Sequence, residues 1–520
     1  MAAITVTSAT ELSNIQGHLL VVSDIQLEGN LTIAAGSILE FRNGAQIICT
    51  EEVYDQNNNA IVNHFSVAFN NNTIIASDYS VFIGYSSISG SLANAEINAD
   101  WFGAATAGLC TKAVNTAIGL SLNQTVVMPS RVYTINSNDI SPIILDKSGT
   151  SLVCNGQINC SSSSLDCMFD LRAERINLLI HRIHRTNGQN DCSAVRISGN
   201  AYDCDIRADF ITAFDKGLDF SPAFYGDAMN SGVQHCRFKW QIISCTYDIY
   251  FDFCANANNV SSQTVQYSVW FTDNYFLGGR LHGVNALYMK PTPPVLPNNY
   301  HLYTPTDCVF ENVGFEKEGQ VSLDLHDCEN FTFKNCRIST NELRRDDESF
   351  HKFILLNNCR NIRIDNKCGF DLNRMDSTDS HNVTITNHNY SDWPMTRACA
   401  LPTLPPSSDI IAYCHSETNA YNRIVMQIYS GTINHEIDFD EIFPDIGGGA
   451  KLLTKIVRLV VSGGMTLKIK CSPNQILALP DISFVCVLSG SSGIQFVCNN
   501  AIIKAAYSSM IINSHELVEL

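Results

Sequence analysis

The sequence predicts an all-β protein, with a solenoid of short parallel strands through most of the chain and an antiparallel β-sandwich after it. Apolar and polar residues alternate with a period of two in short runs bounded by Asn, Gly, Asp and Ser, while helical periodicity is almost absent. Similar units return every 23 to 36 residues in the middle of the chain. Charged residues make up only 16% of the 520 residues, which excludes a disordered chain or a coiled coil.

Residues 1–97 are predicted to form an N-terminal β region that leads into the solenoid. Apolar pairs at Leu31/Ile33 and Leu39/Phe41 are separated by turn residues, and the pattern continues to Ile47. Short apolar runs between turns predict successive short strands of one winding coil.

One helix is predicted over residues 111–122, where small and apolar side chains recur. The tetrapeptide Trp-Phe-Gly-Ala precedes it at 101–104, and a strand with a Pro and a Tyr follows at 125–135. This order resembles the entry to the right-handed parallel β-helix of phage tailspikes and the pectate-lyase-like superfamily. The resemblance covers residues 98–136 by motif and extends to residue 390 by pattern. It implies a parallel β-helix over 98–395, capped by the helix.

The chain departs from that family at 107–112. Ala-Gly-Leu-Cys-Thr-Lys stands there in place of the acidic Gly-Asp-Gly and Thr-Asp-Asp segments of the family. A capping helix needs an apolar face rather than those acids, so the expected fold is unchanged.

A repeated apolar–polar–apolar triplet supports the solenoid. The central residues of the triplets are Asp170, Arg196, Asp219, Asp252, Tyr288 and Asp324. One coil cannot bury its apolar side chains alone, so the coils are expected to stack. An antiparallel sandwich is the competing interpretation for residues 150–390, but it does not explain a triplet that returns every ~30 residues.

A second repeated unit is a strand bracketed by two Asn residues five positions apart. The pairs are Asn330 and Asn335, Asn361 and Asn366, and Asn382 and Asn387. Asn tolerates the left-handed backbone of a coil corner and hydrogen-bonds to an Asn in the next coil. These pairs therefore predict ladders of side-chain amides.

A Pro-rich linker is predicted over residues 396–408, since prolines there interrupt any strand ladder. Residues 409–520 alternate strongly and are punctuated by glycines, which favours a C-terminal antiparallel β-sandwich. The resemblance to tailspikes implies that such a module supports trimer formation or carbohydrate binding.

Charge and cysteine content exclude several classes of function. The net charge is −18, and no basic run exists beyond Arg344 and Arg345, which argues against a nucleic-acid partner. Neither a signal peptide nor a stretch long enough to span a membrane is visible. The 20 cysteines include no CxxC motif, so we expect free buried thiols, no metal site and no cofactor.

The triplet centres supply the candidate catalytic residues. If the triplets share a register, their central side chains form an outward column with backbones ~4.8 Å apart. Asp219 and Asp252 then lie on adjacent coils, where one carboxyl pKa rises and the two can form the acid/base pair of a glycosidase. Asp324 in the column and Glu311 on a neighbouring coil are further candidates. Simple solvation of these outward carboxylates is the alternative.

Basic and aromatic residues supply candidate substrate contacts. Segments 204–209 and 236–240 alternate so that their charged residues point outward, which suits either an acidic sugar or cross-strand ion pairs. Exposed rings stack on the apolar faces of sugars. The candidate substrate-binding residues are Arg207, Arg237, Lys239, Trp270, Tyr288 and His326.

The resemblance implies a phage depolymerase that binds and cleaves a bacterial surface polysaccharide, such as a capsule, by glycosidic hydrolysis with paired carboxylates. It also implies a homotrimer in the virion tail that adheres to the host surface, with attachment through another phage tail protein as an option. Two alternatives stay open. One is a polysaccharide lyase with Tyr288 or His326 as the base, and the other is a receptor-binding fibre without enzymatic activity.

Overall fold

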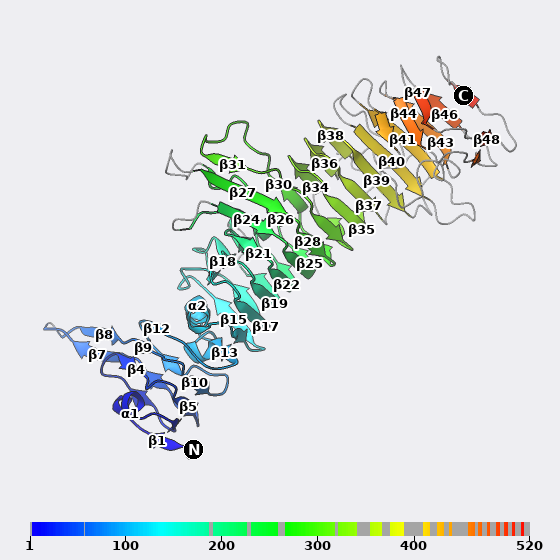
Figure 1. Ribbon diagram of the computed structural model, residues 1–520. Coiled ribbons are helices and arrows are strands. Elements are labelled where there is room, and N and C mark those ends of the chain that lie inside the picture. Colours follow the sequence, from blue (N-terminus) through cyan, green and yellow to red (C-terminus); the bar gives the residue numbers. More distant parts are fainter. Residues whose placement is uncertain are drawn as a thin grey trace. The chain divides into compact units, whose positions relative to one another are not determined.

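A computed structural model of the chain (Figure 1) describes residues 3–388 except 57, 187–190, 226–229, 258–265, 318–320, 341–353 and 367–374. Beyond residue 388 it describes only strands β40 to β49. The chain divides into two compact units. The first unit contains Met1–Thr246, Phe253–Val269 and Pro297–His301, and the second contains Tyr247–Asp252, Trp270–Leu296 and Leu302–Leu520.

The N-terminal part of the first unit contains three parallel sheets that the chain visits in the same order three times. Their strands are β1 (Ile4–Val6), β2 (His18–Val21), β5 (Ile38–Phe41) and β10 (Thr73–Ile75); β3 (Ile25–Gln26), β6 (Ile47–Ile48) and β11 (Phe82–Ile83); and β4 (Leu31–Thr32), β9 (Val67–Ala68) and β12 (Ile88–Ser89). Leu19 pairs with Leu39 and Leu39 with Ile74, and all three are buried. The predicted short strands are therefore confirmed, and successive strands along the chain belong to different sheets.

Two further elements lie between strands of these sheets. Helix α1 (Ala9–Asn14) begins at a capping box in which Ser8 and Glu11 satisfy each other's backbone N–H groups. The antiparallel hairpin of β7 (Thr50–Tyr54) and β8 (Ala60–His64) is inserted between β6 and β9. Every residue of β8 is exposed, so this hairpin contributes little to the core.

The predicted helix is confirmed as α2 (Cys110–Leu120), one residue earlier at its start and two residues shorter at its end. It follows β13 (Glu96–Asn98) and the 3-10 helix η1 (Ala99–Phe102), and it precedes β14 (Thr125–Met128) and β15 (Val132–Ile135). Its face with Ala113, Val114 and Ile118 is buried, which explains why these residues recur at helical spacing.

The rest of the first unit repeats strands in parallel register. Its strands are β16 (Ile143–Leu145), β18 (Cys167–Leu171), β20 (Ser193–Ile197) and β23 (Lys216–Phe220); β17 (Ser151–Cys160), β19 (Asn177–Arg185), β22 (Asp205–Thr212) and β25 (Arg237–Ser244); and β21 (Ala201–Tyr202) and β24 (Asn230–Gln234). Asp170 pairs with Arg196 and Arg196 with Asp219, which confirms the predicted repeat here.

The second unit continues this pattern. Its strands are β26 (Tyr247–Phe251), β30 (Asn285–Met289), β34 (Val321–His326), β36 (Ile354–Asn357) and β38 (Met375–Thr378); and β28 (Tyr275–Leu277), β29 (Arg280–Leu281), β32 (Val309–Glu311), β33 (Gly314–Lys317), β35 (Thr332–Thr340), β37 (Arg363–Asn366) and β39 (Val383–His388). Two further strands, β27 (Tyr267–Thr272) and β31 (Tyr300–Leu302), contain residues of both units. Buried rings of Phe276, Phe310 and Phe333 stack at centroid distances of 4.3 and 4.8 Å.

Every register described between residues 151 and 388 is parallel, which argues against the antiparallel sandwich considered for 150–390. On the same stretch the predicted Asn ladder is confirmed for the first Asn of each pair, whereas the side chains of Asn366 and Asn387 lie outside the described part of the structure. Asn330, Asn361 and Asn382 have φ of 56°, 53° and 54°, and their amides bond in series at 2.9 and 2.7 Å. Asn335 is left-handed as well and bonds to Asn312.

The predicted antiparallel sandwich over 409–520 is wrong in strand direction. The strands described there are β40 (Asp409–His415), β41 (Ile424–Ser430), β42 (Glu436–Asp438), β43 (Ile456–Ser462), β44 (Thr466–Lys470), β45 (Ile476–Ala478), β46 (Val485–Leu488), β47 (Gly493–Val497), β48 (Ile502–Lys504) and β49 (Ile511–Asn513). Among them only β40 and β41 pair antiparallel, and the other pairings are parallel. Period-two alternation reports a half-buried strand but not its direction. The predicted linker over 396–408 lies outside the described residues.

The expected free thiols are confirmed in the described part of the chain. Fourteen cysteines there are free, and all but Cys254 are buried. Burial raises the pKa of Cys49 and of Cys154 to about 12, so these thiols act as small apolar side chains.

Candidate functional site

The predicted column of triplet centres is present in the second unit but misaligned at one position. Tyr288 pairs with Asp324, as predicted. Tyr250, however, is the residue that pairs with Tyr288. Asp252 lies two positions after Tyr250, directly after the last residue of β26. The segments centred on Tyr250 and Asp252 are both apolar–polar–apolar. A shift of two residues keeps every side chain on the same face, so the pattern alone does not distinguish them.

The column is also less exposed than expected. Asp170 and Asp219 are 0% and 3% exposed, and Asp252 and Asp324 are each 7% exposed. These carboxylates are therefore not simply solvated. A buried carboxylate is costly unless it is paired or hydrogen-bonded, so the partners of each decide what it can do.

Asp170 is enclosed by a network of donors. Arg172 and Arg196 donate to Asp170 Oδ2 at 2.6 and 3.1 Å, Ser198 donates to Oδ1, and the Tyr225 hydroxyl lies 3.3 Å from Oδ2. Burial acts to raise the pKa of Asp170, but hydrogen bonding and charge from the arginines, with the Ser198 bond, outweigh it and the pKa is lowered. This carboxylate is held ionised and closed to solvent.

Asp219 has the opposite shift. Ser193 donates to it at 2.5 Å, Ser221 donates to the other oxygen, and Lys216 Nζ lies 3.9 Å away. Burial nevertheless raises the pKa of Asp219. At 3% exposure it presents no surface to a sugar ring. Asp219 and Asp252 belong to different units, so their pairing stays a prediction.

The second unit brings four of the predicted site residues onto one sheet. Lys290 Nζ lies 2.7 Å from Asp252 Oδ2, and His326 Nε2 lies 2.8 Å from Asp324 Oδ1. Alternation along β34 places Asp324 and His326 on the same face, and Tyr288 pairs with Asp324 from the neighbouring strand. We name Asp252, Tyr288, Lys290, Asp324 and His326 the sheet-face site.

Aromatic rings lie at the sheet-face site. The Tyr250 and Tyr288 rings stack at 5.6 Å with 17° between their planes, and Tyr247 lies 5.2 Å from Tyr288. Both Tyr250 and Tyr288 are half-buried, so they keep exposed edges. The arrangement combines carboxylates, cations and aromatic rings, as sugar-binding sites do.

Burial and nearby charge shift the pKa values of two side chains at the sheet-face site. Burial acts to lower the pKa of His326, but its hydrogen bond to Asp324 and the charge of that carboxylate outweigh this, so the pKa is raised. Burial, with the charge of Asp324 added, raises the pKa of Tyr288. His326 Nδ1 is buried and has no hydrogen-bond partner among the described residues.

The remaining candidates lie on other sheets. Glu311 ends β32, with Lys334 Nζ 3.9 Å away. Arg207, Arg237 and Lys239 are exposed on β22 and β25, which confirms the predicted outward alternation. Trp270 is half-buried in β27. None of these five stands on the sheet of Asp324.

Two of these basic residues are part of an ion-pair pattern. Arg207 donates to Asp205, which lies opposite Arg237, while Arg207 lies opposite Lys239. The ion pair of Arg207 and Asp205 lies within β22, so cross-strand ion pairs on this surface stay a prediction.

Sequence reasoning missed Lys290, Tyr247 and Tyr250. Lys290 stands two residues after the triplet centre Tyr288, the same spacing that relates His326 to Asp324. That i+2 position was the available signal, since strand neighbours two apart share a face.

Comparison with known proteins finds no matching family model, curated protein or solved structure. Across the residues that the structure describes, no group of three or more His, Cys, Asp or Glu side chains is placed to hold a metal ion. No helix in that part of the chain is long and apolar enough to cross a membrane.

Proposed function

We propose that the chain folds as a right-handed parallel β-helix of the tailspike type. Ordered visits to three sheets in residues 4–89 and parallel pairing of strands that lie 20 to 38 residues apart support this fold. In such a solenoid each added coil extends the same faces, which provides a long surface for a polymer.

On this scaffold, we propose hydrolysis of a bacterial surface polysaccharide at the sheet-face site. The observation that carries the proposal is the presence of two buried carboxylates, each beside a cation, on a face that also carries stacked tyrosines. Tyr250 and Tyr288 supply rings for the sugar, and the charged groups supply acid and base.

The roles follow from the protonation of each group. Asp252, whose Oδ2 lies 2.7 Å from Lys290 Nζ, takes a proton from the attacking water. His326 carries the proton that its raised pKa retains, and it donates this proton to the glycosidic oxygen. The anomeric carbon then loses the leaving sugar and gains the water oxygen. Asp324 stabilises the imidazolium before transfer.

Spacing favours inversion of the anomeric centre. Asp252 follows β26 and His326 ends β34, and these strands are separated only by β30. Strands two apart place backbones about 10 Å from each other. Acid and base groups ~6.5–9.5 Å apart leave room for water and define inverting glycosidases.

A lyase on the same site is the second candidate, because Tyr288 and His326 are the side chains that could serve as its base. Elimination needs a base that has lost its proton. Both pKa values are raised, so both groups retain protons at higher pH than usual, which favours hydrolysis.

The test is to incubate the purified protein with bacterial capsular polysaccharide and assay reducing ends. Asp252→Asn, Asp324→Asn and His326→Gln are each expected to reduce the rate by ~10²-fold or more. Glu174→Gln, which changes an exposed carboxylate of the first unit, serves as the matched control and keeps full activity. Full activity in the three site variants would remove the sheet-face site from the mechanism.

The products separate the alternatives. Reducing ends without ultraviolet absorbance of an unsaturated uronate indicate hydrolysis, and reducing ends with that absorbance indicate elimination. Binding without any product indicates a receptor-binding fibre.

We also propose a homotrimer in a phage tail, acting at the host surface. The acidic net charge of −18 favours solubility of such a particle and gives no basic surface for nucleic acid.

A further inference from the structure

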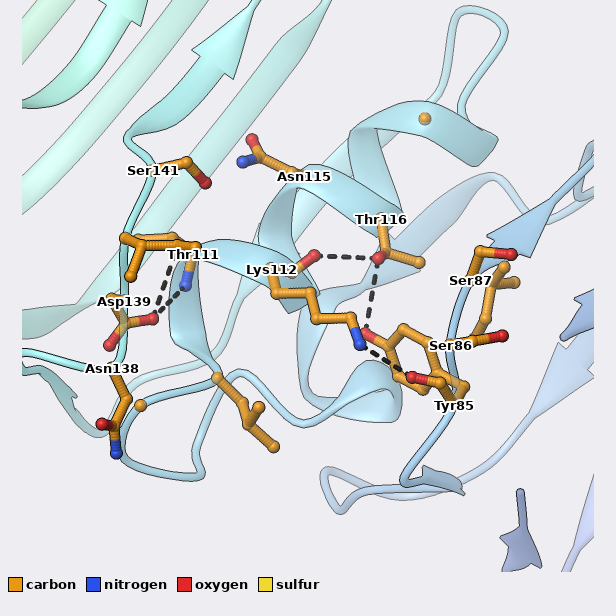
Figure 2. Close-up of a pocket in the computed structure, with 15 residues that line it drawn as sticks. Tyr85, Ser86, Ser87, Thr111, Lys112, Asn115, Thr116, Asn138, Asp139 and Ser141 are labelled. Atoms are coloured by element: carbon orange, nitrogen blue, oxygen red, sulfur yellow. Dashed lines mark hydrogen bonds between the residues drawn. The ribbon is translucent and has the colours of Figure 1, made fainter. Parts of the chain in front are cut away.

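Two adjoining cavities lie beside helix α2 in the first unit. One has a volume of about 560 Å³ and the other about 650 Å³. Both are lined by Tyr85, Ser86, Leu109 and Lys112. Figure 2 shows the first cavity, with the Lys112 side chain extending from helix α2 toward Tyr85, in the connection between β11 and β12 that also carries Ser86 and Ser87. Sizes of ~300–1,000 Å³ are typical of small-ligand sites.

Three separate segments build the first cavity. They are the stretch before β12, helix α2, and the connection between β15 and β16, which contributes Asn138, Asp139 and Ser141. Asp139 links the last two of these segments, since its Oδ1 accepts from the Thr111 backbone N–H at 3.0 Å and from the Thr111 hydroxyl at 3.1 Å. Its Oδ2 accepts from the Asn136 N–H at 3.1 Å. The only carboxylate of the lining is therefore already engaged.

Lys112 is the only cation among the residues that line the first cavity. Its Nζ donates to the Tyr85 carbonyl at 2.7 Å and lies 4.4 Å from the centre of the Tyr85 ring (Figure 2). No ion pair joins it to a carboxylate in the described part of the chain. An ammonium paired only with a neutral carbonyl and a ring retains capacity for an anion.

The rest of the lining combines apolar side chains, among them Ile88, Leu109 and Ile140, with neutral hydrogen-bonding groups. Hydroxyls come from Ser86, Ser87, Thr116 and Ser141, and amides come from Asn115 and Asn138. The first three hydroxyls and the Asn115 amide already make hydrogen bonds within the chain. The Ser141 hydroxyl and the Asn138 side chain make no hydrogen bond within the described residues. Uncharged donors and acceptors around one cation match a sugar ring that bears one carboxylate.

We propose that this cavity binds an acidic sugar residue of the polysaccharide, with the sugar carboxylate on Lys112 and the sugar hydroxyls on the serine and asparagine side chains. The inference rests on the proposed function for the polymeric context, and it specifies that the polysaccharide contains uronic acid. The cavity is a binding site distinct from the sheet-face site, and it holds the polymer without cutting it.

Binding of two matched probes tests the proposal. Methyl β-glucuronide and methyl β-glucoside differ only in the carboxylate, so saturation-transfer NMR titrations compare the charge directly. A charge-assisted hydrogen bond favours the glucuronide about tenfold or more. Lys112→Gln is expected to reduce glucuronide binding to the level of the glucoside, and Lys112→Arg is expected to restore much of it.

Controls separate this inference from the catalytic proposal. Lys334→Gln removes an exposed lysine that lines neither cavity and keeps wild-type glucuronide binding. Asp324→Asn keeps it as well, although the proposed function predicts loss of polysaccharide cleavage. Glucuronide binding that is absent, equal to that of the glucoside, or unaffected by Lys112→Gln in a folded variant overturns the inference. Lys112-dependent binding without any cleavage by the wild type overturns only the hydrolase.

Discussion

At the scale of single residues, the sheet-face site depends on the ion pair between the Asp324 carboxylate and the His326 imidazole. His326 lies 2.8 Å from Asp324, and that carboxylate outweighs burial in setting its pKa. The folded chain therefore binds the His326 proton more tightly than the unfolded chain does. This gives the pair a role in both stability and proton donation.

Stability and activity should respond to pH in the same direction. The contribution of the pair is complete below the unfolded histidine pKa of ~6.5 and is lost as pH rises through the higher folded pKa. Cleavage, which needs protonated His326, falls over the same rise. In Asp324→Asn the His326 titration observed by NMR is expected to move to lower pH. An unchanged titration in that variant would contradict the assigned pair.

A second prediction concerns Phe310, whose buried ring stacks between Phe276 and Phe333. Phe310→Ala is expected to lower the free energy of unfolding by ~3–5 kcal/mol, because it removes buried area and leaves a cavity. Urea denaturation of the full chain checks this. Tyr275→Ala, on the exposed face of the neighbouring strand, is the control and should change stability by less than ~0.5 kcal/mol.

At the scale of elements, asparagines form the turns that precede strands β35, β37 and β39 by combining two effects. Asn330, Asn361 and Asn382 each adopt a positive φ, and their amides bond from one strand end to the next. The left-handed backbone turns the chain, and the amide ladder links successive turns. The turn is local, but the amide bonds join residues 31 and 21 positions apart, so the ladder was predictable only because the Asn-bracketed unit recurs in the sequence.

Variants at Asn361 separate these two effects. Asn361→Gly keeps the left-handed turn without strain and loses only the amide bonds, each worth ~0.5–1.5 kcal/mol. Asn361→Ala loses the same bonds and adds ~1–2 kcal/mol of backbone strain. Denaturant unfolding should therefore rank the wild type first, Gly second and Ala last. Equal stability of the two variants would show that the backbone angle contributes nothing.

At the scale of the whole molecule, strand pairing was largely predictable and the surroundings of the strands were not. The triplet repeat gave the register of Asp170, Arg196 and Asp219 because apolar side chains on both sides of each centre must stack. It failed at Asp252, where a shift of two residues preserves the pattern. Burial of these carboxylates was also missed, since an alternating strand does not reveal what covers its outer face.

The cavity beside α2 shows a second limit. Its residues Ser86, Lys112 and Asn138 come from three segments, and the sequence of each segment alone does not indicate a binding site. Only folding brings them together, and no local spacing encodes that approach. Strand direction after residue 409 was missed for a similar reason, because pairing direction depends on connections rather than on alternation.

The assembly state is a further prediction at this scale. A tailspike-type β-helix is expected to form a homotrimer, so light scattering of the purified chain should give three times its 57.4 kDa. A monomeric mass across a wide concentration range would contradict that expectation. It would leave the sheet-face site untouched, since its residues all lie in one unit.

The spacing between paired strands has a consequence for how this protein can change. Ile25 and Ile47 are 22 residues apart, whereas Ile47 and Phe82 are 35 apart, yet both pairs align in register. The extra length includes the β7–β8 hairpin. Connections of this kind are positions where a peptide segment can be inserted without changing the pairing of the strands. Exchange of such segments offers a route to new surface loops without redesign of the scaffold.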